Sequence, residues 1–167
     1  MMRVVVSTIL FLIVFLIETS FISSLPSIFS TIPLVFALSV YLIQHQGISD
    51  GVAWMIGYGF LIDLMHLSDI SFSTIPITVA VIVAVITAKH LFSNRSFYGV
   101  LACAISSYVT FVLCEVFFTS NSWSVFIQTH IERLGMLIIV VAILFSLAPH
   151  IRKIVHVMFF ASRNRYY

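Results

Sequence analysis

Residues 4–23 read VVVSTILFLIVFLIETSFIS, an apolar run in which Glu18 is the only charge. A helix needs about 20 mostly apolar residues to cross the hydrocarbon core of a membrane, so this run predicts a transmembrane helix. The whole 167-residue chain has the same character, because 61% of its residues are hydrophobic and only 8% are charged. A water-soluble domain carries roughly a quarter charged residues. The composition therefore predicts a single all-α integral membrane domain over residues 1–167.

Charges, prolines and polar clusters divide the rest of the sequence into further apolar runs. A transmembrane β-barrel would show weaker runs of alternating polarity, so helices are expected. The second run is the weakest, because it is short, follows Pro26 and Pro33 and has no flanking base; a tilted or re-entrant element is the alternative there. The predicted bundle has six transmembrane helices, at residues 4–23, 31–44, 50–66, 72–88, 97–118 and 133–150.

The lysines and arginines predict the orientation, because cytoplasmic loops hold an excess of them. With six spans and both termini inside, every base except Arg133 becomes cytoplasmic, namely Arg3, Lys89, Arg95, Arg152, Lys153, Arg163 and Arg165. The tail 151–167 mixes four of these bases with apolar residues, as a helix on an anionic inner leaflet does. Contact with anionic membrane lipids is therefore expected at Arg152, Lys153, Arg163 and Arg165.

The acids fall mainly on the external side. Glu18, Asp63 and Glu115 each lie near the outer end of a predicted helix, and Arg133 is the one base near them. Charged groups inside a membrane usually face the bundle interior and find partners. We therefore expect these four residues to form an outward polar chamber that receives a cation, a proton or the polar groups of a partner. The alternative is that Glu18 and Glu115 are hydrated at the level of the lipid headgroups.

Small residues form a ridge on the third predicted helix. Gly47, Gly51, Met55, Gly59 and Asp63 follow one another at intervals of four residues. Glycines at this spacing let a second helix backbone approach closely. The ridge is therefore predicted to be a helix-packing or partner interface in which Asp63 accepts hydrogen bonds from a neighbour. Binding of a ligand or ion by Asp63 is the alternative.

Several classes of function are disfavoured. A net charge of +2 leaves no basic surface for a nucleic acid. The sequence lacks hydrolase, metalloprotease and nucleotide-binding motifs, so no enzymatic activity, catalytic residue or cofactor is expected. His66 follows Asp63 by three residues, but His130 and Glu132 are the only further candidate ligands and the spacing matches no recognised metal site.

The order of these features resembles the bacterial rod shape-determining protein MreD family. The resemblance is carried by Ile32-Pro33-Leu34 at the second span and by Gly59-Phe60-Leu61-Ile62-Asp63-Leu64 at the end of the third. It implies a non-enzymatic scaffold of the elongation machinery, which synthesises peptidoglycan and maintains cell shape. Such a scaffold lies in the bacterial cytoplasmic (inner) membrane. It binds a bitopic MreC-like protein and, through it, RodA and a transpeptidase.

Two other functions stay open. The MreD family is similar in fold to the substrate-binding S components of energy-coupling-factor vitamin transporters, which implies a vitamin-binding role for the outward chamber. An ion or proton channel through Asp63 and Glu115 is the third possibility. It is the least favoured, because Asp50 is the only further acid in the inner half of the bundle.

Overall fold

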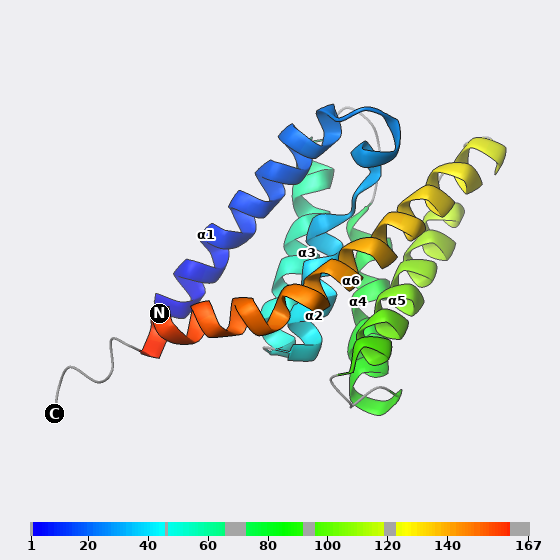
Figure 1. Ribbon diagram of the computed structural model, residues 1–167. Coiled ribbons are helices and arrows are strands. Elements are labelled where there is room, and N and C mark those ends of the chain that lie inside the picture. The colour runs from blue at the N-terminus through cyan, green and yellow to red at the C-terminus, as the bar shows by residue number, and fades with distance from the viewer. Residues whose placement is uncertain (1, 46, 66–72, 92–95, 119–122, 161–167) are drawn as a thin grey trace, which may run out of the picture.

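The described part of the chain consists of helices joined by short connections, and it contains no strand (Figure 1). This computed structural model describes residues 2–45, 47–65, 73–91, 96–118 and 123–160. Two π-helical turns and two 3-10 turns extend or link the α-helices, at Ile17–Phe21 (η1), Ile22–Ser24 (η2), Ser27–Thr31 (η3) and Thr87–Leu91 (η4). The α-helices are α1 (Met2–Leu16), α2 (Leu34–His45), α3 (Ile48–Met65), α4 (Thr74–Ile86), α5 (Phe97–Phe118) and α6 (Trp123–Phe160).

Four helical stretches of the described chain are long and apolar enough to cross a membrane. They are Val4–Ser24, Ile48–Met65, Phe97–Phe117 and Ile127–Leu147. Two shorter apolar stretches accompany them, at Leu34–His45 and Thr74–His90. The predicted all-helical architecture, rich in helices of membrane-spanning length, is therefore confirmed.

The second apolar run forms the shortest α-helix and lies at the centre of the bundle. α2 has 12 residues, or about 18 Å of helix, whereas the hydrocarbon core is about 30 Å thick. Nevertheless α2 contacts each of the other five α-helices. Val35, Ala37 and Val40 are completely buried. Packing against other helices, rather than length, therefore stabilises α2, as is usual for short helices.

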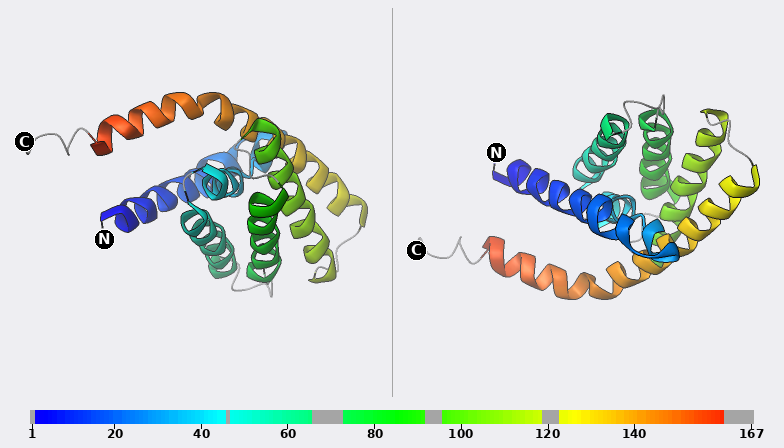
Figure 2. Two further views of the ribbon diagram at one scale, coloured as in Figure 1. Left: turned by 90° about the horizontal axis from the view of Figure 1, so that it is seen from below. Right: turned by 90° about the horizontal axis from the view of Figure 1, so that it is seen from above.

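The last helix differs most from its predicted bounds. α6 has 38 residues and begins at Trp123, ten residues before the start of the predicted span 133–150. Arg133 lies within the helix, and its side chain lines a cavity among the helices. At the other end α6 continues into the basic tail as far as Phe160. Figure 2 shows that α6 curves, and Pro149 within it lacks the backbone donor that a straight helix needs.

One face of α1 attaches it to the bundle. Phe11 packs against Trp54 with ring centroids 5.5 Å apart, and Phe15 meets the edge of Tyr58 at 6.1 Å. Trp54 also donates a hydrogen bond from Nε1 to Ser7 Oγ at 2.9 Å. The start of α1 and the end of α6 lie at the same end of the molecule in both figures (Figures 1 and 2).

Candidate functional site

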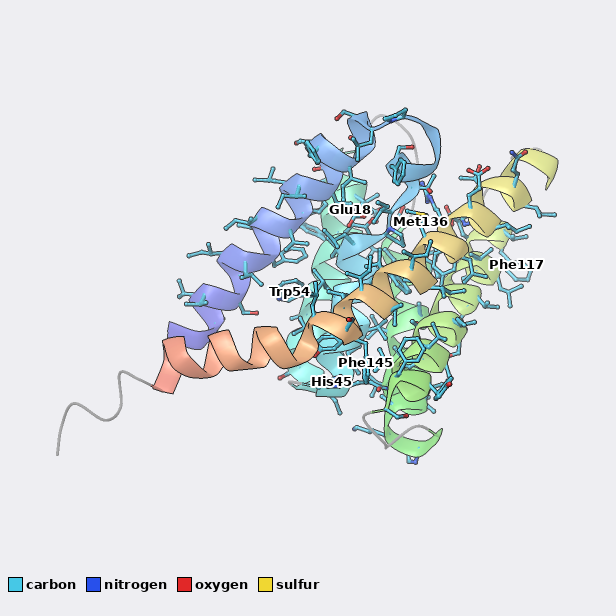
Figure 3. The ribbon with its side chains drawn as sticks, in the orientation of Figure 1. Glu18, His45, Trp54, Phe117, Met136 and Phe145 are labelled. Atoms are coloured by element: carbon cyan, nitrogen blue, oxygen red, sulfur yellow. The ribbon has the colours of Figure 1, made fainter. Side chains whose placement is uncertain are left out.

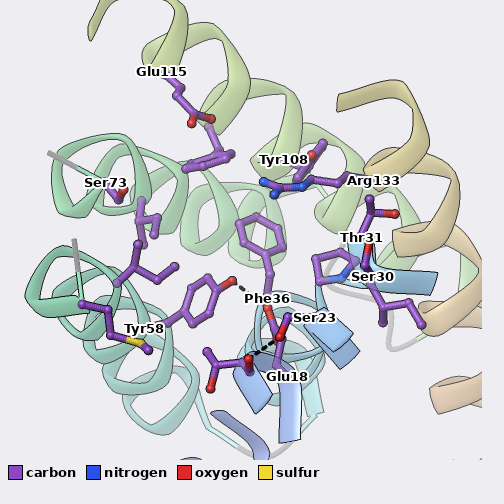
Figure 4. Close-up of a pocket in the computed structure, with 17 residues that line it drawn as sticks. Glu18, Ser23, Ser30, Thr31, Phe36, Tyr58, Ser73, Tyr108, Glu115 and Arg133 are labelled. Atoms are coloured by element: carbon purple, nitrogen blue, oxygen red, sulfur yellow. Dashed lines mark hydrogen bonds between the residues drawn. The ribbon is translucent and has the colours of Figure 1, made fainter. Parts of the chain in front are cut away.

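A cavity of about 520 Å³ lies at one end of the bundle (Figure 4). Figure 3 places Glu18 toward this end and His45 at the opposite end. Residues from the turns η1, η2 and η3 and from α2, α3, α4, α5 and α6 line the cavity, so segments distant in sequence build it. Its charged and aromatic lining consists of Glu18, Phe36, Tyr58, Tyr108, Phe111, Glu115 and Arg133.

Glu18 joins the first three helices. It lies in the π-helical turn η1, and such turns are frequent at functional sites. The Tyr58 hydroxyl donates to Glu18 Oε1 at 2.6 Å, and the Val35 backbone N–H donates to Oε2 at 2.6 Å. Val35 lies in the first turn of α2, where backbone N–H groups lack helical partners and the helix dipole favours a negative charge. The Glu18 carboxylate therefore caps α2 and ties it to α1 and α3.

A second polar chain joins α5 to α6. Tyr108 Oη lies 3.1 Å from His130 Nδ1, and His130 Nε2 lies 3.5 Å from Glu115 Oε2. The Tyr108 ring also packs against Phe36 and Phe111, with centroids 5.7 Å and 6.0 Å away. Glu115 is thus held on the wall of the cavity beside an aromatic surface. Its side chain keeps 27% of its area exposed.

Arg133 supplies a positive charge to the same cavity. It projects from α6, and Figure 4 shows its guanidinium beside Tyr108. Its charge acts on both carboxylates of the cavity, Glu18 and Glu115. The described residues include no ion-pair partner of Arg133 within 4.0 Å. The arrangement therefore suits the binding of a small charged molecule between groups of opposite sign.

Asp63 lies outside the cavity, which corrects its placement in the predicted chamber. Its Oδ1 accepts the Ser73 backbone N–H at 2.7 Å, and its Oδ2 accepts the Thr74 backbone N–H at 3.0 Å. The Thr74 hydroxyl also donates to Oδ2. Asp63 thus caps the start of α4, where backbone N–H groups lack helical partners. The cavity therefore contains three of the four charged residues expected there.

The glycine ridge packs inside the protein and not on its surface. A Cβ atom added at Gly51 would lie 2.5 Å from the Ser39 carbonyl oxygen, so α2 and α3 approach closely there. One added at Gly59 would lie 3.1 Å from the Thr74 Cα, so α3 and α4 do the same. Gly47 is different, because it precedes α3 and donates its N–H to the Leu42 carbonyl at 3.1 Å. Gly51, Gly59 and Asp63 are therefore contacts between helices of this chain, and only surfaces beside them are accessible to a partner.

Three important residues escaped the sequence reasoning. The sequence analysis assigned no role to Tyr58 or Tyr108 and considered His130 only as a metal ligand. Tyr58 donates a hydrogen bond to Glu18, and His130, which lies beside Tyr108, contacts Glu115 at 3.5 Å. A usable signal was available, because a tyrosine or histidine buried near a membrane carboxylate needs a polar partner.

Some predicted sites lie beyond what the structure describes. Arg163, Arg165 and His66 are outside the described residues, and of Arg152 and Lys153 only the backbone, within α6, is described. The lipid contacts expected of the four bases stay a prediction. Within the described residues, no three His, Cys, Asp or Glu side chains come together as a metal site.

Comparison with known proteins identifies no relative. No family model, no curated protein and no solved structure matches this chain. Its function is therefore inferred from its residues and their geometry.

Proposed function

We propose that this chain is a non-enzymatic membrane scaffold of the MreD type, embedded in the bacterial inner membrane. The observation that carries the proposal is the position of Gly59–Leu64, the phrase behind the resemblance. Its glycine and aspartate form the joint between α3 and α4. Its Phe60 and Leu64 are 57% and 43% exposed. The same phrase therefore holds the bundle together and presents an apolar surface beside the joint.

The proposed topology has six crossings with both termini in the cytoplasm. Two features support it. The start of α1 and the end of α6 lie at the same end of the molecule (Figures 1 and 2). Lys89, in η4, lies at the end of α4 opposite to the cavity, as the excess of bases in cytoplasmic loops requires if the cavity faces outward.

The proposed partner is the transmembrane helix of a bitopic, MreC-like protein, through which RodA and a transpeptidase join the assembly. Lipid tails are as apolar as leucine, so helices associate in membranes through close packing rather than through hydrophobicity. Phe60 and Leu64 are one turn apart on the outer face of α3, next to the rigid joint. Together they offer a firm surface against which a second helix can pack.

Replacing both Phe60 and Leu64 by alanine is expected to lower copurification of an MreC-like partner about tenfold, because two anchors of the contact lose their side chains. The measurement is the molar ratio of partner to this chain after affinity and size-exclusion purification from a common membrane. Phe117→Ala on α5 is the matched control, since that phenylalanine is 85% exposed, and its ratio should equal that of the wild type.

Variants of the joint between α3 and α4 provide a second test of the same proposal. Gly59→Ala and Asp63→Asn shift the α3–α4 contact mildly and should lower the ratio in proportion to their effect on stability. If the double alanine variant, Gly59→Ala and Asp63→Asn all retain the partner as the wild type does, α3 is not the assembly surface and the scaffold proposal loses its basis.

The cavity favours a second candidate, the substrate-binding S component of an energy-coupling-factor vitamin transporter. A volume of about 520 Å³ falls within the range of small-molecule sites, roughly 300–1,000 Å³. For this function, vesicles that contain the chain and a coupling ATPase module should accumulate a labelled vitamin only when ATP is supplied. Accumulation that is equal without the chain would exclude this role.

A further inference from the structure

Most polar groups around the cavity are already occupied within the protein. Both oxygens of Glu18 accept hydrogen bonds, from Tyr58 and from the Val35 N–H. Thr19 donates its hydroxyl to the Phe15 carbonyl, and Ser23 donates to the Thr19 carbonyl. These groups shape the wall, but they have little capacity left for a ligand.

Two further lining groups carry opposite charges. Glu115 has a protein contact to His130 at 3.5 Å, and a carboxylate with two oxygens offers about four acceptor positions. Arg133 is exposed and has five N–H donors in a fork that matches phosphate and carboxylate groups. They project from α5 and α6, two helices that pack against each other, so one small molecule can reach both.

An aromatic surface lines the same cavity as these charges. Phe36, Tyr108 and Phe111 pack together, with ring centroids 5.7 Å, 6.0 Å and 6.3 Å apart, and all three line the cavity. Aromatic faces attract ammonium groups, and clusters of such rings recognise alkylated ammonium ions in particular. This surface can therefore contact an ammonium group inside the cavity.

We propose that the cavity binds an ammonium–phosphate zwitterion, with its ammonium group at Glu115 and the aromatic surface and its phosphate at Arg133. The charge pattern disfavours a simple anion, which Glu18 and Glu115 would repel, and a simple cation, which Arg133 would repel. The same chemistry occurs in free phosphoethanolamine derivatives and in the headgroup of phosphatidylethanolamine. The inference rests on the cavity, as the second candidate function does, but it requires binding alone.

The test uses the purified full-length chain in detergent and measures binding of three probes by native mass spectrometry and calorimetry. The probes are glycerophosphoethanolamine, phosphatidylethanolamine and phosphatidylglycerol, the last of which has the phosphate but no amine. We expect wild-type protein to bind phosphatidylethanolamine at least about tenfold more tightly than phosphatidylglycerol, because one charge-assisted contact is lost with the latter. Binding of glycerophosphoethanolamine as well would assign the site to a soluble ligand, and its failure to bind would assign it to lipid.

Variants locate the site. Glu115→Gln and Arg133→Gln should each weaken binding of phosphatidylethanolamine at least about tenfold. Glu132→Gln is the matched control, because Glu132 lies beside Arg133 on α6, is bonded to Gln128 and does not line the cavity. Its affinity should match that of the wild type.

Two results would overturn the proposal: no binding of either zwitterion, or binding that neither cavity variant changes. Binding without ATP-driven uptake would support this inference while contradicting the transport function. The scaffold role is tested by copurification of the partner with variants of α3. The binding results for the cavity therefore do not affect it.

Discussion

Gly51→Ala is expected to lower the free energy of unfolding by about 3 kcal/mol or more, which would leave little folded protein in detergent. The new methyl carbon would lie 2.5 Å from the Ser39 carbonyl oxygen and 2.7 Å from the Ile43 backbone nitrogen. Both are backbone atoms of α2, so a change of rotamer does not relieve the clash. α2 has to move away from α3, and because α2 contacts all the other α-helices the whole bundle is disturbed. Unfolding monitored by far-UV circular dichroism during titration with a denaturing detergent would measure this loss.

Gly135→Ala makes the same chemical change at an exposed position of α6, where nothing lies within 4 Å of the added atom. Alanine is a better helix former than glycine, so this control should be stabilised by about 0.5–1 kcal/mol. If the two substitutions have equal effects, the close approach of α2 and α3 at Gly51 is refuted.

Glu18→Ala is expected to destabilise the protein by about 3 kcal/mol. The substitution removes the acceptor for two donors at once, the Tyr58 hydroxyl and the Val35 N–H. A buried donor without a partner costs about 1–3 kcal/mol, and Val35 is completely buried. The same unfolding titration measures the effect.

A double-mutant cycle separates the two contacts of Glu18. Comparing Glu18→Ala, Tyr58→Phe and the combined variant should give a coupling energy of about 1.5 kcal/mol. This value lies near the upper limit found for side-chain hydrogen bonds between membrane helices, as expected for a short bond to a carboxylate. Glu132→Ala, on an outer face of α6, should change stability by less than about 0.5 kcal/mol. A coupling energy near zero would mean that Tyr58 and Glu18 do not interact in the folded protein.

Part of the cavity lining could be predicted from the sequence. Charge alone identified Glu18, Glu115 and Arg133, because a charged residue in a strongly apolar chain needs a polar neighbourhood. The same expectation of polar neighbours was correct for Asp63, but it did not say whether those neighbours would line the cavity or lie at the end of a helix. Either environment satisfies a carboxylate, and the choice depends on which N–H groups lie nearest in three dimensions.

The bounds of the helices could likewise be predicted only in part. The fifth helix was predicted at residues 97–118, where it is found, because turns and charges bound it on both sides. α6 extends beyond the predicted span 133–150 on both sides: Arg133 was read as a boundary, whereas the helix continues through it and its side chain lines the cavity. A rule based on sequence places a charge by its depth along one helix, but its actual cost depends on the side chains of the other helices.

The sequence by itself determined that the chain is helical and that several of its helices are apolar enough to cross a membrane, because hydropathy and the need to pair every backbone N–H and C=O within a segment are local properties. It also marked glycines at which helices approach closely. Only the tertiary structure decided that the shortest helix, α2, is the central one, and which acid caps which helix. Those outcomes depend on contacts between residues far apart in the chain, such as Glu18 with Tyr58 and Asp63 with Thr74, and no local pattern specifies such pairs.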